Sequence, residues 1–236
     1  MNNPRLALGS TTMLSWTFSI AMRLIRAYSL DTVPASSSVL MMDYTNEFDA
    51  LIFDCDGTLS DSMPLHFVAW RETLAKHGIT FTEERFYQMG GMPSGMIVET
   101  LGREQSVRVD AVSVALEKEA AFVGMIDRVQ PCEHICEIAR FHHGRLPMAV
   151  ASGSGREVVV KQLNVLGLDA LFQTIVAAED TQRHKPEPDV FLEAARRLGV
   201  AAQRCLVFED SPLGFQAAEA AGMKWLDVRP AAWAAR

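Results

Sequence analysis

The spacing of hydrophobic and polar residues changes along the chain, and these changes predict where strands and helices lie. Short apolar runs that end in polar residues are typical of strands buried on both faces of a sheet. Apolar residues at helical spacing lie between such runs, and the alternation predicts a doubly wound, Rossmann-like parallel sheet of the α/β class. The runs predicted as strands are residues 48–53, 146–151, 174–178, 205–208 and 224–228, and the predicted helices between them are residues 133–141, 155–166, 189–198 and 213–221.

The part of the chain that follows the first strand has a different pattern. Residues 62–127 contain no run of the strand type, and their apolar residues recur at helical spacing. The helices predicted there are residues 63–77, 83–89, 94–101 and 110–126, of which the first three are closed by glycine. We therefore expect a small helical cap domain, residues 62–130, inserted into a catalytic core made of residues 47–61 and 131–236.

The first 46 residues do not share the pattern of the remainder. They are rich in serine and threonine, and Asp31 is the only acidic residue before residue 40. The apolar stretch 13–22 has about half of the ~20 residues that a membrane span needs. We expect a leader that is disordered or precedes a later translation start at Met41 or Met42. An organelle-targeting peptide, which has a similar composition, is an alternative, and a packed element is another.

The composition limits the classes of function that need to be considered. Hydrophobic residues make up 49% and charged residues 22% of the 236 residues, which is typical of a folded globular chain. A net charge of -7 argues against a nucleic-acid binder, because such proteins need a basic surface. The four cysteines are too few for a disulfide scaffold, which favours a reducing compartment, the cytoplasm. Neither a membrane nor a nucleic acid is therefore expected as a partner. The sequence leaves the oligomeric state open, and a monomer is compatible with it.

Acidic and hydroxyl residues follow several of the predicted strands. Asp54 and Asp56 come directly after the first strand, and at this spacing both side chains can point to the same side. Ser152 follows the second strand, and Glu209 with Asp210 follows the fourth. The carboxyl ends of parallel strands meet at one edge, so these groups are expected in one pocket. Clustered carboxylates repel each other unless a cation lies between them, and Mg²⁺ is the hard cation that also pairs with phosphates.

These residues resemble the ordered motifs of a known family. The motifs are Asp54-Cys55-Asp56-Gly57-Thr58, Ser152, Lys185-Pro186 and Glu209-Asp210. In this order they are similar to the haloacid dehalogenase superfamily, in the branch of the β-phosphoglucomutases and fructose-1-phosphate phosphatases. The resemblance extends over residues 48–229 and implies a core with a small helical cap.

The resemblance implies a role for each matching residue. Asp54 would be the nucleophile that forms an aspartyl-phosphate. Asp56 would protonate the leaving group and then activate water, which requires a pKa raised toward neutrality by the neighbouring carboxylates. Mg²⁺ would be held by the carboxylates of Asp54 and Asp210 and the main-chain carbonyl of Asp56. Glu209 would be a further ligand or would lie just behind the ligands.

The resemblance also implies which residues bind the phosphoryl group. Ser152 would donate a hydrogen bond to a phosphoryl oxygen, helped by the Gly153 amide near a helix N-terminus. Lys185 would offset negative charge on the phosphoryl group and on Asp54. His66, on the first helix of the cap, would contact the substrate or Asp56, although a packing or capping role is also open.

The expected function is a Mg²⁺-dependent phosphatase that hydrolyses a small phosphate monoester, with a sugar phosphate as the expected substrate. A β-phosphoglucomutase is the first alternative, because it uses the same nucleophile. A mutase must hold a second phosphate, yet Gly90 and Gly95 stand in the cap loop where mutases of this branch carry Lys and Arg. The second alternative is a non-catalytic phosphate-binding regulatory module, although no catalytic group is missing.

Two other patterns are weaker. Ser152-Gly153-Ser154-Gly155 after a strand suggests a dinucleotide-binding loop, but Val158 stands where that fingerprint requires a third glycine. Cysteines and histidines between residues 132 and 143 suggest a zinc site, but no second cysteine pair follows, so core packing is the favoured interpretation.

Overall fold

A five-stranded parallel sheet forms the centre of the computed structural model, which describes residues 43–229. The predicted leader, residues 1–46, lies almost wholly outside the described residues. The strand order is β5-β4-β1-β6-β7. The strands are β1 (Ala50–Phe53), β4 (Met148–Ala151), β5 (Thr174–Val176), β6 (Cys205–Glu209) and β7 (Lys224–Asp227). The predicted α/β fold with a parallel sheet is confirmed.

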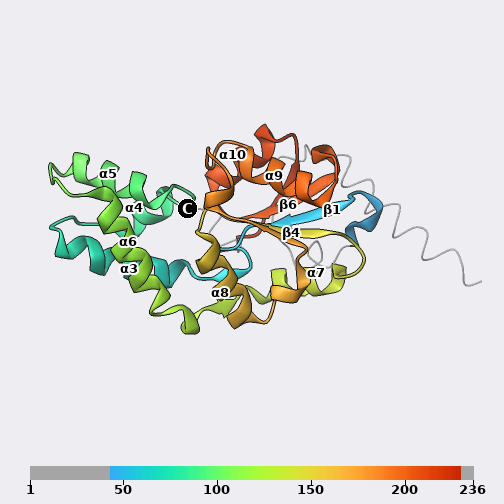
Figure 1. Cartoon of the computed structure of the whole chain (residues 1–236), viewed down its shortest axis with the longest axis horizontal. Coiled ribbons are helices and arrows are strands. Elements are labelled where there is room, and N and C mark those ends of the chain that lie inside the picture. The colour runs from blue at the N-terminus through green and yellow to red at the C-terminus, as the bar shows by residue number, and fades with distance from the viewer. Residues whose placement is uncertain (1–42, 230–236) are drawn as a thin grey trace, which may run out of the picture. The chain divides into compact units, whose positions relative to one another are not determined.

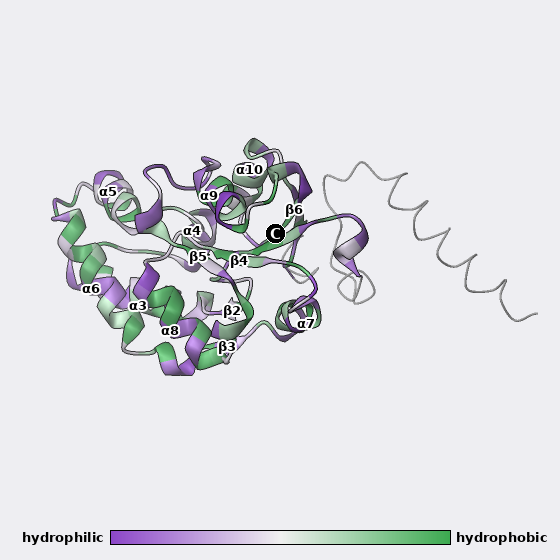
Figure 2. Ribbon diagram, turned by 45° about the vertical axis from the view of Figure 1, so that its right-hand side comes forward, coloured by the Kyte–Doolittle hydropathy of each residue, from purple (hydrophilic) through white to green (hydrophobic). Residues whose placement is uncertain are grey.

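Helices cover both faces of this sheet (Figure 1). One face carries α7 (Glu133–His142) and α8 (Arg156–Leu166), and the other carries α9 (Asp189–Leu198) and α10 (Pro212–Ala220). Side chains along β1 alternate between the two buried layers: Leu51 and Phe53 pack in the first, Ala50 and Ile52 in the second. The central strands are accordingly mainly hydrophobic, whereas the helices carry both hydrophobic and hydrophilic residues (Figure 2). Short 3-10 turns lie at Tyr44–Asn46, Ile126–Arg128, Asp169–Leu171, Ala178–Asp180 and Ala202–Arg204.

Four helices follow the first strand and form the helical insert, a name used here for residues 63–128. They are α3 (Met63–Lys76), α4 (Glu83–Gln88), α5 (Ser94–Glu104) and α6 (Ala111–Val123), and they pack around an apolar cluster of their own. Two short antiparallel strands, β2 (Ser60–Asp61) and β3 (Gln130–Pro131), pair where the chain leaves the sheet and where it returns. This pair lies at the predicted cap boundaries, and the division into domains stays a prediction. None of the described helices is long and apolar enough to cross a membrane.

The helix predicted over residues 94–101 is longer than expected. Gly102 was expected to end it, yet α5 continues to Glu104. The following loop folds back over the helix, and the Val107 amide donates a hydrogen bond to the Gly102 carbonyl at 2.8 Å. A Cβ at residue 102 would lie 2.9 Å from the Val107 carbonyl oxygen. Glycine is therefore needed here for close packing of the loop, not for terminating the helix.

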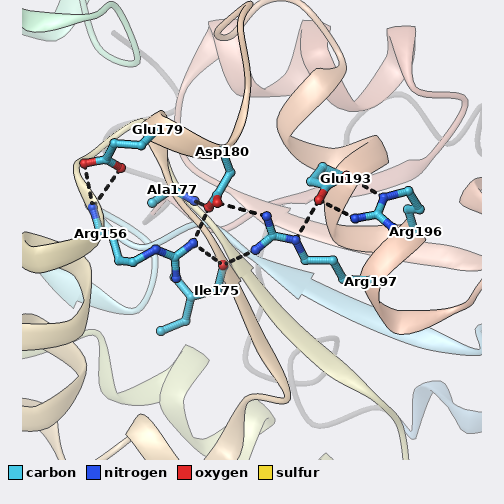
Figure 3. A network of polar contacts seen from close by, with 8 residues as sticks. All are labelled: Arg156, Ile175, Ala177, Glu179, Asp180, Glu193, Arg196 and Arg197. Atoms are coloured by element: carbon cyan, nitrogen blue, oxygen red, sulfur yellow. Dashed lines mark hydrogen bonds and ion pairs between the residues drawn. The ribbon is translucent and has the colours of Figure 1, made fainter.

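A polar network ties β5 to α8 and α9 (Figure 3). Asp180 accepts hydrogen bonds from the guanidinium groups of Arg156 and Arg197, which also both donate to the Ile175 carbonyl. Arg197 Nε donates in addition to Glu193 at 2.7 Å. Because Arg197 contacts three elements of the fold, the network holds the end of β5 in place between two helices.

We expect Arg197→Ala to lower the free energy of unfolding by about 1–3 kcal/mol, because it removes three hydrogen bonds around a side chain that is only 25% exposed. Arg196→Ala is the matched control, since Glu193 is the one ion-pair partner of Arg196 among residues 43–229 and the side chain is 70% exposed. That control should cost less than about 0.5 kcal/mol. Urea denaturation measures both, and equal losses would contradict the structural role of Arg197.

Candidate active site

The candidate active site lies at the carboxyl ends of three neighbouring strands. Asp54 directly follows β1, Ser152 directly follows β4, and Glu209 is the last residue of β6. A cavity of about 310 Å³ opens there, between this edge of the sheet and the helical insert. All eight residues predicted for the site line it: Asp54, Asp56, His66, Ser152, Gly153, Lys185, Glu209 and Asp210.

A buried lysine joins two of the carboxylates. Lys185 Nζ donates to Asp54 Oδ1 at 2.6 Å and to Glu209 Oε2 at 2.7 Å. Asp54, Glu209 and Asp210 each place one carboxylate oxygen within 4.8 Å of the others. Three carboxylates therefore lie near one ammonium group, that of Lys185, which can compensate only part of their negative charge.

The pKa values of Asp54 and Asp210 reflect this shortage of positive charge. Burial raises the pKa of Asp54 well above its ordinary value, with Lys185 opposing the effect and Glu209 adding to it. Burial also raises the pKa of Asp210, and Glu209 and Asp54 raise it further. A divalent cation would favour the ionised forms of these acids, and carboxylate oxygens are the ligands that hard cations prefer. The donor set therefore fits Mg²⁺. The further ligand expected from Asp56 is its main-chain carbonyl, and that assignment stays a prediction.

Glu209 is held firmly by the chain that follows it. Its Oε1 accepts hydrogen bonds from the amides of Asp210 and Ser211 at 3.1 and 2.9 Å, and from the Ser211 hydroxyl at 2.9 Å. The Ser211 hydroxyl in turn accepts from the Gly214 amide and caps the first turn of α10. A Cβ at residue 214 would lie 2.0 Å from Glu209 Cδ. The glycine thus makes room for the carboxylate.

Asp210 depends on a second glycine. Gly57 has a φ of +86°, a conformation that other residues rarely adopt. A Cβ at this position would also lie 2.2 Å from Asp210 Oδ2. Two constraints therefore require glycine at position 57: the backbone conformation of the turn and the close approach of the Asp210 carboxylate.

The Asp56 carboxylate does not belong to the group of Asp54, Glu209 and Asp210, and it is surrounded by hydrogen-bond donors. Ser62 Oγ, Gln162 Nε2 and His66 Nε2 lie 2.6, 2.9 and 3.0 Å from Oδ1. Ser154 Oγ donates to Oδ2 at 2.6 Å. Neither the core nor the helical insert holds Asp56 alone, because His66 belongs to the insert whereas Gln162 and Ser154 follow β4.

These donors reverse the expected shift of the Asp56 pKa. Burial alone would raise that pKa, but His66 beside the carboxylate and the hydroxyls of Ser154 and Ser62 lower it below its ordinary value. The expectation that neighbouring carboxylates raise the pKa toward neutrality is therefore wrong for this arrangement. It overlooked the donors, which come from three separate segments of the chain.

His66 also contacts a lysine that the sequence reasoning missed. Lys118 Nζ lies 2.9 Å from His66 Nδ1, and an ammonium group can only donate, so Nδ1 is the acceptor. The ring proton must then be on Nε2, from which it is donated to Asp56. Burial and the charge of Lys118 lower the pKa of His66, in agreement with a neutral ring.

Lys118 and Gln162 had a signal in the sequence. Lys118 lies between Val114 and Phe122 at intervals of four, on the buried stripe of α6. Gln162 occupies a buried position of α8 beside Leu163. A polar residue on the apolar face of a helix must find a partner, because burying an unpaired polar group is costly. Gln162 finds two, since Ser60 donates to its Oε1 at 2.5 Å.

The loop after β4 provides the predicted phosphate-binding groups. Ser152 Oγ accepts a hydrogen bond from the Ser154 amide at 3.0 Å, which leaves its hydroxyl proton available to a ligand. Gly153 lines the cavity beside it. Glu179 follows β5 but does not join the acidic group. It accepts from the Arg156 amide at the start of α8.

The cysteines and histidines between residues 132 and 143 make contacts of a structural kind. Cys136 is fully buried, and its thiol lies 3.3 Å from the Leu59 carbonyl oxygen. His142 Nε2 accepts from the Tyr44 amide at 3.2 Å while Nδ1 contacts the Ile138 carbonyl. All four cysteines of the chain are free thiols.

Comparison with known proteins relates this geometry to other chains. The family model described as "haloacid dehalogenase-like hydrolase" matches residues 51–228. The fructose-1-phosphate phosphatase YqaB of Escherichia coli is 39% identical over 183 residues, which cover 77% of this chain and 97% of the relative. A phosphorylated carbohydrates phosphatase of Thermotoga maritima is 28% identical over 180 residues, covering 75% and 82% of the two chains.

A solved structure has a similar fold. The β-phosphoglucomutase of Clostridium difficile superposes with a TM-score of 0.69 at 26% sequence identity. The superposition covers 76% of this chain and 84% of that chain. The arrangement of sheet and helices is thus similar to that of a β-phosphoglucomutase.

We expect Gly214→Ala to lower the free energy of unfolding by about 1–3 kcal/mol, because the new methyl group collides with Glu209. In the first half of a helix this exchange would otherwise be neutral or stabilising. Gly95→Ala in α5 is the matched control, since a Cβ there has no neighbour within 4 Å. Thermal unfolding compares the two, and a Gly214→Ala protein as stable as the control would show that Glu209 can move.

Proposed function

Since the chain belongs to the haloacid dehalogenase-like hydrolase family, we propose that it is a Mg²⁺-dependent phosphatase that hydrolyses a small phosphate monoester. The predicted family resemblance is confirmed by the family match. The observation that carries the proposal is the group of buried Asp54 and Glu209 and half-buried Asp210 with Lys185, which lines a cavity of small-molecule size. Relatives that are phosphatases of phosphorylated sugars support a sugar phosphate as the substrate.

Asp54 is the proposed nucleophile. One of its carboxylate oxygens attacks phosphorus, the bond from phosphorus to the leaving oxygen breaks, and an aspartyl-phosphate forms. Lys185 Nζ, 2.6 Å from Asp54, offsets the charge that spreads over the phosphoryl oxygens. The Ser152 hydroxyl and the Gly153 amide donate to the same oxygens in this proposal, because both line the cavity beside Asp54.

Asp56 is the proposed acid and base. It protonates the leaving alkoxide in the first half-reaction and takes a proton from the attacking water in the second. That water attacks the phosphorus of the aspartyl-phosphate, the bond from phosphorus to the Asp54 oxygen breaks, and inorganic phosphate and the Asp54 carboxylate are released. The donors around it favour the ionised form, which is the form that the second half-reaction needs. In the first half-reaction the incoming phosphate places further negative charge near Asp56 and so favours its protonation.

Mg²⁺ would be held by the carboxylates of Asp54 and Asp210 and by the main-chain carbonyl of Asp56. Glu209 already has hydrogen bonds on both carboxylate oxygens, which favours a supporting position behind the ligands. When bound, the ion neutralises the clustered acids and the phosphate, so that two anions can approach each other.

The helical insert is proposed as the cap that closes over the substrate. His66, Trp70 and Lys118 of the insert line the same cavity as Asp54. His66 is proposed to orient Asp56 rather than to bind the substrate directly, since its Nε2 lies 3.0 Å from that carboxylate. Lys118 fixes the ring from the other side.

We expect Asp54→Asn to reduce phosphate release from p-nitrophenyl phosphate by at least about a thousandfold, because the amide is not a nucleophile. Asp61→Asn is the matched control, since Asp61 is exposed on β2, and its activity should equal that of the unaltered chain. A folded Asp54→Asn protein with full activity would disprove the proposal.

Removal of divalent cations gives an independent prediction. Dialysis against a chelator should abolish phosphate release, and added Mg²⁺ should restore it, because the carboxylates cannot all remain ionised around a phosphate without a cation. Activity that persists in the chelator would show that Lys185 alone supplies enough positive charge.

A β-phosphoglucomutase is the second candidate, because a solved mutase shares the fold. A mutase must bind a second phosphate, yet the cap loop is neutral where it lines the cavity, from Gly90 to Pro93. Incubation with β-glucose 1-phosphate distinguishes the two activities. Conversion to glucose 6-phosphate without release of inorganic phosphate would establish the mutase, and release of phosphate would support the phosphatase.

A further inference from the structure

The helical insert forms one wall of the cavity, and this wall contains a hydrogen-bonded pair of polar side chains. Ser94 at the start of α5 and Glu119 on α6 both line the cavity. Ser94 Oγ donates to Glu119 Oε1 at 2.7 Å, which joins the two helices. The insert also lines the cavity with apolar side chains: Met63, Trp70, Phe86, Met89, Met92 and Ile97.

Glu119 keeps hydrogen-bonding capacity for a ligand. Both of its contacts in the described part of the chain, from Ser94 Oγ and from Lys118 Nζ at 3.1 Å, end on Oε1. A carboxylate oxygen has two lone pairs, so Oε2 can accept hydrogen bonds from a bound molecule. The side chain is 33% exposed and therefore accessible from the cavity.

The charges around this spot disfavour a second anion. Lys118 and Lys185 are the lysines that line the cavity, and no arginine lines it within residues 43–229. Lys185 is occupied by Asp54 and Glu209, and Lys118 by His66 and Glu119. An anionic group bound at Glu119 would therefore meet a carboxylate with no unengaged lysine nearby.

We infer that Ser94 and Glu119 form a subsite for hydroxyl groups of the non-phosphorylated part of the substrate. The subsite also discriminates against substrates that carry a second phosphate. This inference rests on the proposed function, because it takes the phosphate end of the substrate to lie at Asp54. The substrate class is then a polyhydroxylated monophosphate, a sugar or sugar alcohol phosphate. Neutral donors suit Glu119 better than an ammonium group, since Lys118 already places an ammonium on Oε1.

Binding measured without turnover tests the subsite. Asp54→Asn and Asp54→Asn/Glu119→Gln proteins are titrated with sorbitol 6-phosphate, with n-hexyl phosphate, which lacks the hydroxyls, and with fructose 1-phosphate and fructose 1,6-bisphosphate. Glu119→Gln retains the acceptor for Lys118 and Ser94 but removes the charge. Glu117→Gln is the matched control, because Glu117 on the same helix pairs with His77 at the surface and does not line the cavity.

Two affinity ratios should change with Glu119→Gln. The preference for sorbitol 6-phosphate over hexyl phosphate should fall about tenfold, because a charged acceptor binds hydroxyls more strongly than an amide. The preference for fructose 1-phosphate over the bisphosphate should also fall about tenfold, because the repelling charge is gone. The control should leave both ratios unchanged.

The outcomes separate this inference from the proposed function. If Glu119→Gln weakens all four ligands by one factor, Glu119 acts only through Lys118 and the inference is wrong. Unchanged affinities for all four would also overturn it. Phosphate release by the unaltered chain is measured separately, so that a chain with the expected ratios but without turnover would contradict the phosphatase alone.

Discussion

The structure depends on the burial of like charges at one edge of the sheet. Asp54, Glu209 and Asp210 lie together because β1 and β6 are neighbours and end at the same level. Desolvation and mutual repulsion raise the pKa of Asp54 and of Asp210, and Lys185 compensates only part of this cost. The same lack of positive charge that makes the group unfavourable in isolation makes it a good receptor for a divalent cation with a phosphate.

The opposite electrostatic arrangement surrounds Asp56, two residues further along the chain. Its carboxylate accepts hydrogen bonds from hydroxyl, amide and imidazole groups, of which the hydroxyls and the imidazole lower its pKa. Two carboxylates in one turn thus have different environments, one short of positive charge and one rich in donors. Such a separation is what different chemical roles for the two groups require. Gly57, which directly follows Asp56, has a φ of +86° and lets the backbone turn sharply after the second of the two carboxylates.

The sequence predicted the fold better than it predicted the surroundings of the site. Within residues 43–229, the five strands of the sheet and the eight α-helices were placed by periodicity, because each has a local pattern. The strand pair β2 and β3 was missed, since two residues are too short to show alternation. The acids and Lys185 were found because they follow strands or match motifs. Lys118 and Gln162 were missed because their partners, His66 and Asp56, are distant in the sequence.

The missed residues show how the helical insert and the core can share one chemical site. Asp56 is contacted by Gln162 and Ser154 from the core and by His66 from the insert, so its environment is complete only when the two parts are together. Any separation of the insert from the core would remove His66 and leave the core donors in place. The set of donors around Asp56 is therefore coupled to the position of the insert, which also carries the proposed subsite of Ser94 and Glu119 in the same cavity. This coupling offers a physical route by which the fit of a substrate at the insert can affect the proton transfer proposed for Asp56.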